Sequence, residues 1–155
     1  MWKAFQRYRA LPPESRALFH RAVFLLPWVT LSLRLRGFKK TQATLQNRLT
    51  SASLQDPRNQ ANAETVEHTC RMVAAGAHYG VVHPSCLPDS LTLWYLLQKQ
   101  NVPATLRIGV SKSSQKFEAH AWVEHEGRAL NQADDHHQHY AAFDNAFSDL
   151  SDEQL

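Results

Sequence analysis

A helix that begins at Cys86 is the feature that most constrains the fold. In HPSCLPDSLTLWYLLQKQ, Ser85 suits the N-cap, and Pro88 is tolerated because the first backbone N–H groups of a helix have no intrahelical acceptor. Helix-forming residues continue to Gln100, where Asn101 and a nearby proline predict the end. Unpaired N–H groups and the positive end of the helix dipole favour a thiolate at this position. Cys86 is therefore a candidate nucleophile.

A period of two predicts a strand that carries His120. His120 and Trp122 fall on one face together with Glu118 and Glu124, while Ala and Val residues and Phe117 fall on the other. His120 is therefore not on the plain apolar face. We consider it the candidate base for Cys86. Trp122 could wall a substrate cleft beside it, although packing is the commoner role of such a ring.

The pair Glu126-Gly127 predicts a hairpin turn that returns the chain antiparallel to the His120 strand. With a three-residue loop, Gln132 lies opposite His120. With a two-residue loop, Ala133 does, and Asn131 is the nearest polar neighbour on that face. Either register supplies an amide near the imidazole, and a side-chain oxygen there could hold the ring in the useful tautomer.

Two segments, CLPDSLTLWYLLQKQNVPATLRIGV and FEAHAWVEHEGRALN, resemble the nucleophile helix, following strand and His-bearing hairpin of the transglutaminase-like cysteine peptidases. Within that family they resemble the leader peptidases of lasso peptide maturation, and weaker similarity covers residues 18–45. The resemblance implies an α+β fold, in which N-terminal helices precede a papain-like core whose small antiparallel sheet packs on the nucleophile helix. It also implies that Cys86 is the nucleophile, that His120 is the base, and that the enzyme cuts the leader from a ribosomally made precursor.

The third member of the family's triad is an Asp, which we expect twelve residues after His120, where this chain has Gln132. Gln132 or Asn131 could orient His120 through an amide oxygen, as an Asn does in papain-like enzymes. Asp134 or Asp135 could do so instead, although Asp134 also reads as an N-cap.

The resemblance further implies three partners: the precursor's leader peptide, a separate leader-recognition protein, and an asparagine-synthetase-like cyclase that takes the freed core. Two other functions stay open. One is a transglutaminase-like acyl transferase on another peptide, and the other is a catalytically impaired adaptor that binds precursor or synthetase. We expect no nucleic-acid partner, since the chain has no compact aromatic and arginine pattern of a known module.

Other motifs predict less. Cys70 has no comparable context and is interpreted as a small buried apolar residue. The histidines at 136, 137 and 139 follow two Asp residues, but adjacent histidines point different ways, so we predict a solvated turn and no metal site. His83 could help to shape the site around Cys86. No phosphate-cradling glycine loop occurs, and we expect no cofactor.

Charge is unevenly distributed along the chain. Residues 1–50 hold ten Lys or Arg and one acid, so this segment is +9 and the remainder of the +3 chain is −6. The segment could contact an acidic leader, an acidic partner protein or an anionic membrane, or it could simply be a solvated face of packed helices. With 155 residues and 43% apolar content, we expect one domain overall, with residues 1–50 as basic helices packed on a core at 60–150.

Within the basic segment, a helix is predicted from Ser15 to about Leu35, with a kink or break at Pro27 and an end at Gly37. Further helices are predicted at 39–49 and 63–77, and a strand at 104–110. The uncharged run 22–33 is too short to span a bilayer. No secretory signal is apparent, and two cysteines give no disulfide framework, so we expect a cytoplasmic protein.

Overall fold

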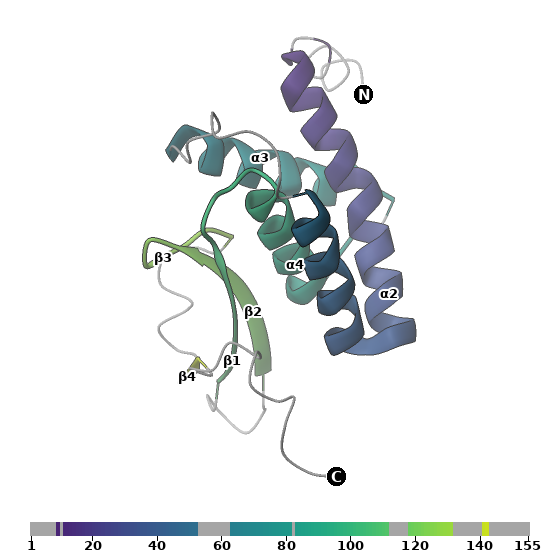
Figure 1. Cartoon of the computed structure of the whole chain (residues 1–155), viewed down its shortest axis with the longest axis vertical. Coiled ribbons are helices and arrows are strands. Elements are labelled where there is room, and N and C mark those ends of the chain that lie inside the picture. Colours follow the sequence, from purple (N-terminus) through teal and green to yellow (C-terminus); the bar gives the residue numbers. More distant parts are fainter. Residues whose placement is uncertain are drawn as a thin grey trace.

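The computed structural model describes Arg9 and residues 11–52, 63–81, 83–111, 118–131 and 141–142. Figure 1 shows its helices gathered on one side and its strands on the other, an arrangement that agrees with the predicted α+β class. In chain order the elements are α2 (Pro13–Ala52), α3 (Ala63–Tyr79), α4 (Cys86–Gln98), β1 (Thr105–Ser111), β2 (Glu118–His125), β3 (Arg128–Ala129) and β4 (Ala141–Ala142).

Helix α2 consists of two arms that meet at Gly37. The φ of 76° and ψ of 175° at Gly37 are the only non-helical values inside α2, and this left-handed φ favours glycine. In Figure 1 the second arm returns alongside the first. The Thr41 hydroxyl donates to the Gly37 carbonyl oxygen at 2.8 Å and lies 2.9 Å from the Ser32 hydroxyl, which ties the arms together at the bend.

The predicted end at Gly37 is confirmed. Of the kink or break predicted at Pro27, the break is wrong. The backbone keeps helical values through Pro27, so the missing N–H of proline does not end the helix. A continuous buried stripe crosses this position, since Ala22, Leu26 and Val29 are at most 1% exposed. Packing of that stripe stabilises the helix and outweighs the loss of one backbone hydrogen bond.

One apolar core joins the three helices to the sheet. Leu18 and Leu45 from the two arms of α2 pack in the same cluster as Val73 of α3 and Val123 of β2. Helix α4 lies at its centre, with every residue from Ser90 to Leu97 buried. The basic N-terminal helices therefore share their core with the remainder of the described chain.

The sheet has the strand order β3-β2-β1-β4, and all neighbouring strands are antiparallel. The turn residues Glu126 and Gly127 both have left-handed φ values, 50° and 75°, which are typical of a two-residue type I′ hairpin. His125 pairs with Arg128. The two-residue alternative for the hairpin loop is therefore the one that the structure adopts.

Candidate active site

Cys86 is the first residue of α4 and is half-buried. Ser85 occupies the N-cap with an extended backbone, as predicted, but its hydroxyl makes no capping hydrogen bond. The Ser85 side chain therefore gives no acceptor to the N–H groups of the first turn. Such groups, at the positive end of a helix dipole, can stabilise an oxyanion or a thiolate.

His120 lies on a ladder of side chains along one face of the sheet. Its ring stacks on Trp122, with 6.2 Å between ring centroids and 18° between ring planes. Trp122 Nε1 donates to Glu124 Oε1 at 2.9 Å, and Arg107 Nε forms an ion pair with Glu124 Oε2 at 3.0 Å. This chain of contacts fixes the Trp122 ring, which in turn provides a rigid support for His120.

The residues paired with His120 and Trp122 on β1 differ in size. Its partner on β1 is Gly109, which has no side chain, whereas Trp122 faces Arg107. Trp122 itself is only 1% exposed, so it packs against His120 and does not form the exposed wall of a substrate cleft. Of the two roles considered for Trp122 from the sequence, packing is the one that its burial supports.

Ser90 ties α4 to the edge of β2. Its hydroxyl donates to the Ala121 carbonyl oxygen at 2.9 Å and accepts a hydrogen bond from Asn131 Nδ2 at 2.8 Å. Asn131 Oδ1 accepts the backbone N–H of Val123 at 3.0 Å. Ser90 is fully buried. The hairpin, the strand and the helix are thus joined by one hydrogen-bonded cluster, one helical turn after Cys86.

A second contact sets the register of α4 along the sheet. Gln98 Nε2 donates to the Ala104 carbonyl oxygen at 2.9 Å, and Ala104 precedes β1 at the end where Thr105 pairs with Glu124. Ser90, early in α4, is bonded to Ala121, and Gln98, at the end of α4, lies near the end of β2 that holds Glu124. Helix α4 and strand β2 therefore run side by side in the same direction. Cys86 lies four residues before Ser90, which is about 6 Å along a helix.

Along β2, His120 lies one residue before Ala121, which is about 3 Å along a strand. The beginning of α4 is therefore level with the first residues of β2. His120 occupies the face opposite Val123, which packs in the helical core. On the hairpin side of β2, β3 pairs with Glu124 and His125, and Leu130 and Asn131 continue the hydrogen bonding to Val123.

Of the residues proposed to orient His120, the structure describes only Asn131. Asn131 uses its carboxamide to hold Val123 and Ser90, which gives it a structural role. Gln132, Asp134 and Asp135 lie outside the described residues, as do the histidines at 136, 137 and 139. In the part of the chain that the structure describes, no group of three or more His, Cys, Asp and Glu could hold a metal ion.

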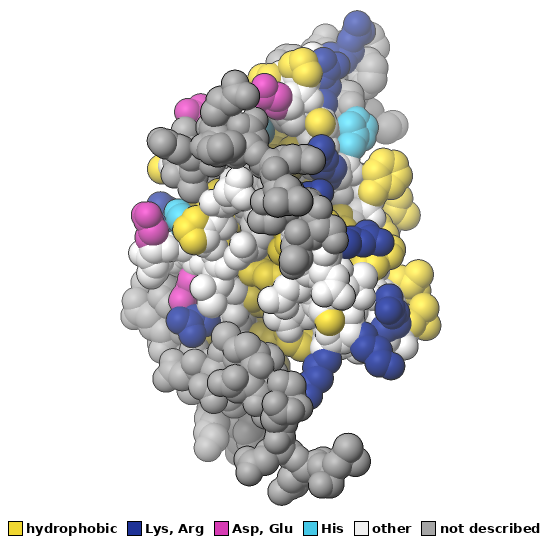
Figure 2. Space-filling view, viewed as in Figure 1, with side chains coloured by type: hydrophobic (Ala, Val, Ile, Leu, Met, Phe, Trp, Pro, Cys, Tyr) yellow, Lys and Arg dark blue, Asp and Glu magenta, His cyan; other side chains and the backbone are white. Residues whose placement is uncertain are grey.

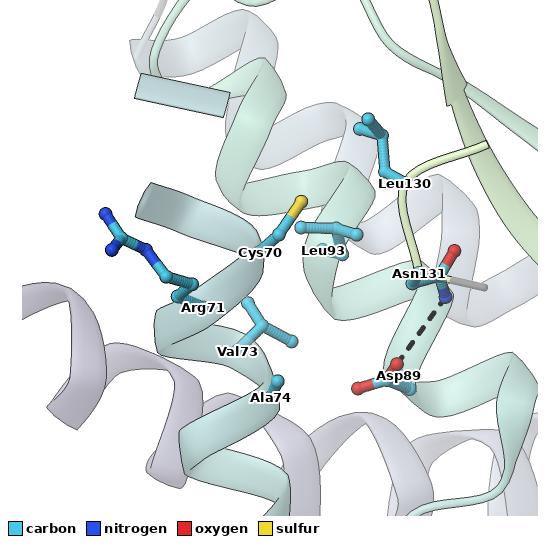
Figure 3. A pocket seen from close by; sticks show the side chains of 8 residues that line it. All are labelled: Cys70, Arg71, Val73, Ala74, Asp89, Leu93, Leu130 and Asn131. Atoms are coloured by element: carbon cyan, nitrogen blue, oxygen red, sulfur yellow. Dashed lines mark hydrogen bonds between the residues drawn. The ribbon is translucent and has the colours of Figure 1, made fainter. Parts of the chain in front are cut away.

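A pocket of about 410 Å³ opens between α3, α4 and the chain after β3 (Figure 3). Burial raises the pKa of the Cys70 thiol to about 11, so Cys70 stays protonated at neutral pH and is a poor nucleophile. Cys70 is partly buried and packs against the core, so its interpretation as a small buried apolar residue holds in part. The pocket is lined by Cys70, Arg71, Val73, Ala74, Asp89, Leu93, Leu130 and Asn131.

Asp89 is the ionisable group on the α4 side of this pocket. Burial raises the pKa of its carboxyl above the usual 3.8, and the hydrogen bond from Asn131 partly offsets this effect. Figure 3 shows that contact, which is 3.5 Å long. The other carboxyl oxygen, Oδ1, is buried without a hydrogen-bond partner among the described residues. Ionisation of Asp89 therefore destabilises the folded chain.

Asp89→Asn is expected to increase stability at neutral pH. Because the folded pKa is raised, the free energy of unfolding of the native chain falls as pH rises from about 4, the unfolded pKa, through the folded value. The variant has no ionisable group at position 89, so its free energy of unfolding should not show this fall. Urea unfolding of both proteins between about pH 4 and pH 7 measures it, and parallel pH profiles would contradict the argument.

Ser90→Ala is expected to reduce the free energy of unfolding by about 1–3 kcal/mol, since it leaves two buried polar groups without a partner. Ser85→Ala is the matched control: Ser85 is exposed and makes no capping bond, so we expect a change within about 0.5 kcal/mol. Urea unfolding compares the two variants. Equal losses would mean that Ser90 does not anchor α4 to β2.

Two features of the site were not predicted. Ser90 was not singled out, although a small polar residue directly before the mostly apolar run from Leu91 to Leu97 is a signal of a buried hydrogen bond. The ion pair of Arg107 and Glu124 was also missed. The alternation of the strand placed Glu124 on the His120 face. Finding Arg107 as its partner also required the register between β1 and β2, which the sequence alone did not give.

The comparison with protein families identifies the chain. A family model described as the transglutaminase-like superfamily matches residues 16–144. Comparison with curated proteins and with solved structures gave no match. The matched range covers both arms of α2, the start of α4 and the His120 strand, and this superfamily typically contains cysteine-based enzymes of peptidase or acyltransferase type. The chain belongs to the transglutaminase-like superfamily.

Proposed function

We propose that this protein is a cysteine peptidase that removes the leader from a ribosomally synthesised precursor during lasso peptide maturation. The observation that carries the proposal is the register of α4 along β2, fixed by the hydrogen bond between Ser90 and Ala121. That bond lies four residues after Cys86 and one residue after His120. It supports a catalytic pair formed by the thiol and the imidazole.

In the proposed mechanism, the Cys86 thiolate attacks the carbonyl carbon of the peptide bond between leader and core. The backbone N–H groups of Cys86 and Leu87, at the start of α4, stabilise the oxyanion. His120 then protonates the leaving amine, which frees the core and leaves the leader as a thioester on Cys86. Water, deprotonated by His120, hydrolyses the thioester and restores the thiol.

The site's other residues act by positioning. Trp122 supports one face of the His120 ring, held by its hydrogen bond to Glu124. We propose that a residue after Asn131, namely Gln132, Asp134 or Asp135, accepts the hydrogen bond from the ring that selects the useful tautomer. An amide stabilises the imidazolium less than a carboxylate does, so we expect a slower enzyme if Gln132 has this role than if an Asp has it.

In this proposal the enzyme needs no cofactor and works in the cytoplasm. A separate leader-recognition protein presents the precursor, and an asparagine-synthetase-like cyclase receives the freed core. The superfamily assignment favours a second candidate, transfer of the acyl group to an amine. In that reaction the Cys86 thiolate attacks a glutamine carboxamide of the substrate and expels ammonia, and an amine then attacks the thioester. Both reactions pass through a thioester on Cys86, but they differ in the group that leaves and in the group that attacks.

The experiment incubates the full-length protein with the precursor and its leader-recognition partner, followed by mass spectrometry. Leader removal adds one water across a single peptide bond. Acyl transfer releases ammonia without separating leader from core. If neither product forms and the precursor is only bound, the protein is an adaptor and the peptidase proposal is wrong.

A further inference from the structure

The outer face of the first arm of α2 carries large apolar side chains that are exposed in the described part of the chain. Phe24 and Leu35 are each 75% exposed, and Leu31 is 56% exposed. Their spacings of seven and four residues put them on one side of the helix, over about 16 Å of its length. Trp28, half-buried, lies on the same stripe. Contiguous exposed apolar surface of this kind marks an interaction site.

Cations surround this stripe. Between Ser15 and Ala52 the chain has seven Lys or Arg and no Asp or Glu. Figure 2 shows basic and apolar side chains side by side along the flank where Figure 1 places α2. Arg34 and Arg36 flank Leu35 in the sequence, and Arg21 lies one turn before Phe24. The surface is therefore apolar along its middle and positive at both ends.

A groove of about 470 Å³ continues the surface toward the end of α4. Its lining combines apolar side chains with the cations Arg21, Arg48 and Lys99. The Arg48 guanidinium lies 5.1 Å from the Trp28 ring centre, and Lys99 Nζ lies 5.8 Å from that of Tyr95. The groove is lined by His20, Arg21, Phe24, Leu25, Trp28, Arg48, Tyr95, Leu96 and Lys99.

We propose that this face binds the surface of an anionic lipid bilayer. Phe24, Leu31 and Leu35 enter the boundary between headgroups and acyl chains, while Arg21, Arg48 and Lys99 contact lipid phosphates. A bilayer offers an apolar layer beneath a continuous negative surface, and so it matches the stripe and both positive ends at once. The proposal does not depend on the proposed peptidase activity.

The helix lies along the bilayer in this proposal and does not cross it. By length and composition Pro13–Leu49 could span a membrane. However, the helix bends at Gly37, and its inner stripe, including Ala22 and Val29, is fully buried in the protein core. The exposed side chains Phe24, Leu31 and Leu35 leave the outer side available to lipid.

The test is co-sedimentation of the full chain with vesicles of phosphatidylglycerol and phosphatidylcholine, compared with phosphatidylcholine alone. We expect binding to the anionic vesicles that weakens as salt is raised. The double variant Phe24→Ser/Leu35→Ser should bind at least about tenfold more weakly, because two exposed apolar side chains are removed. Arg21→Ala/Arg48→Ala should lose a similar factor through charge.

Val81→Ser is the matched control, since Val81 is 92% exposed but lies outside α2, and it should bind like the native chain. Cys86→Ala should also bind normally, which separates this test from that of the peptidase activity. Absence of binding to anionic vesicles, equal binding to neutral ones, or an equal loss for Val81→Ser overturns the proposal. So does binding of an acidic peptide on this face without binding of vesicles.

Discussion

Replacement of Cys86 by alanine is expected to reduce leader cleavage by a factor of at least about 10³, because no other group in the proposed site can form the thioester. The measurement is the rate of leader release by mass spectrometry, with the precursor and its recognition partner present. Circular dichroism should show the native helix content, since Cys86 is only half-buried at the start of α4.

Cys70→Ala is the matched control for this experiment. Cys70 lies in the pocket between α3 and α4, and its pKa of about 11 keeps it protonated, so we expect nearly native cleavage. Iodoacetamide at neutral pH should label Cys86 before Cys70. Undiminished cleavage by Cys86→Ala, or an equal loss for both variants, would exclude the thiol mechanism.

Replacement of His120 by alanine is expected to reduce cleavage by about 10³ to 10⁴, because the thiol loses its base and the leaving amine loses its proton donor. The rate should also lose the pH dependence that titration of the imidazole gives to the native enzyme. Rates of leader release measured from about pH 5 to pH 9 test both expectations.

His125→Ala is the control on the same strand. His125 lies at the other end of β2, where its Nδ1 is 2.7 Å from the Pro103 carbonyl oxygen, so its loss should change stability slightly and leave the pH profile intact. A purely structural role for His120 would instead lower the rate by the same factor at every pH. That outcome would remove His120 from the chemistry.

Local signals predicted the elements that carry the site. The proline at position 88 and the serine before Cys86 predicted where α4 begins, and Asn101, with its left-handed φ of 57°, follows its end. The Glu126-Gly127 pair predicted the hairpin. These signals are strong because each depends on the backbone conformation of a few adjacent residues.

Contacts between distant segments could not be predicted in the same way. The hairpin register depended on whether the loop had two or three residues, and both were compatible with the sequence. Helix α2 continues through Pro27 because its inner stripe packs on the core, an effect that local propensity does not contain. The role of Asn131 likewise depends on Ser90, 41 residues earlier.

The parallel course of α4 and β2 has a consequence for how this domain tolerates changes in length. Two hydrogen bonds, at Ser90 and Gln98, determine how far the helix has advanced along the strand. Residues added between β1 and β2 leave both bonds unchanged. One residue added between Cys86 and Ser90 turns the thiol by about 100° around the helix axis. Natural relatives should therefore vary in length between β1 and β2, and should keep the same number of residues between Cys86 and Ser90.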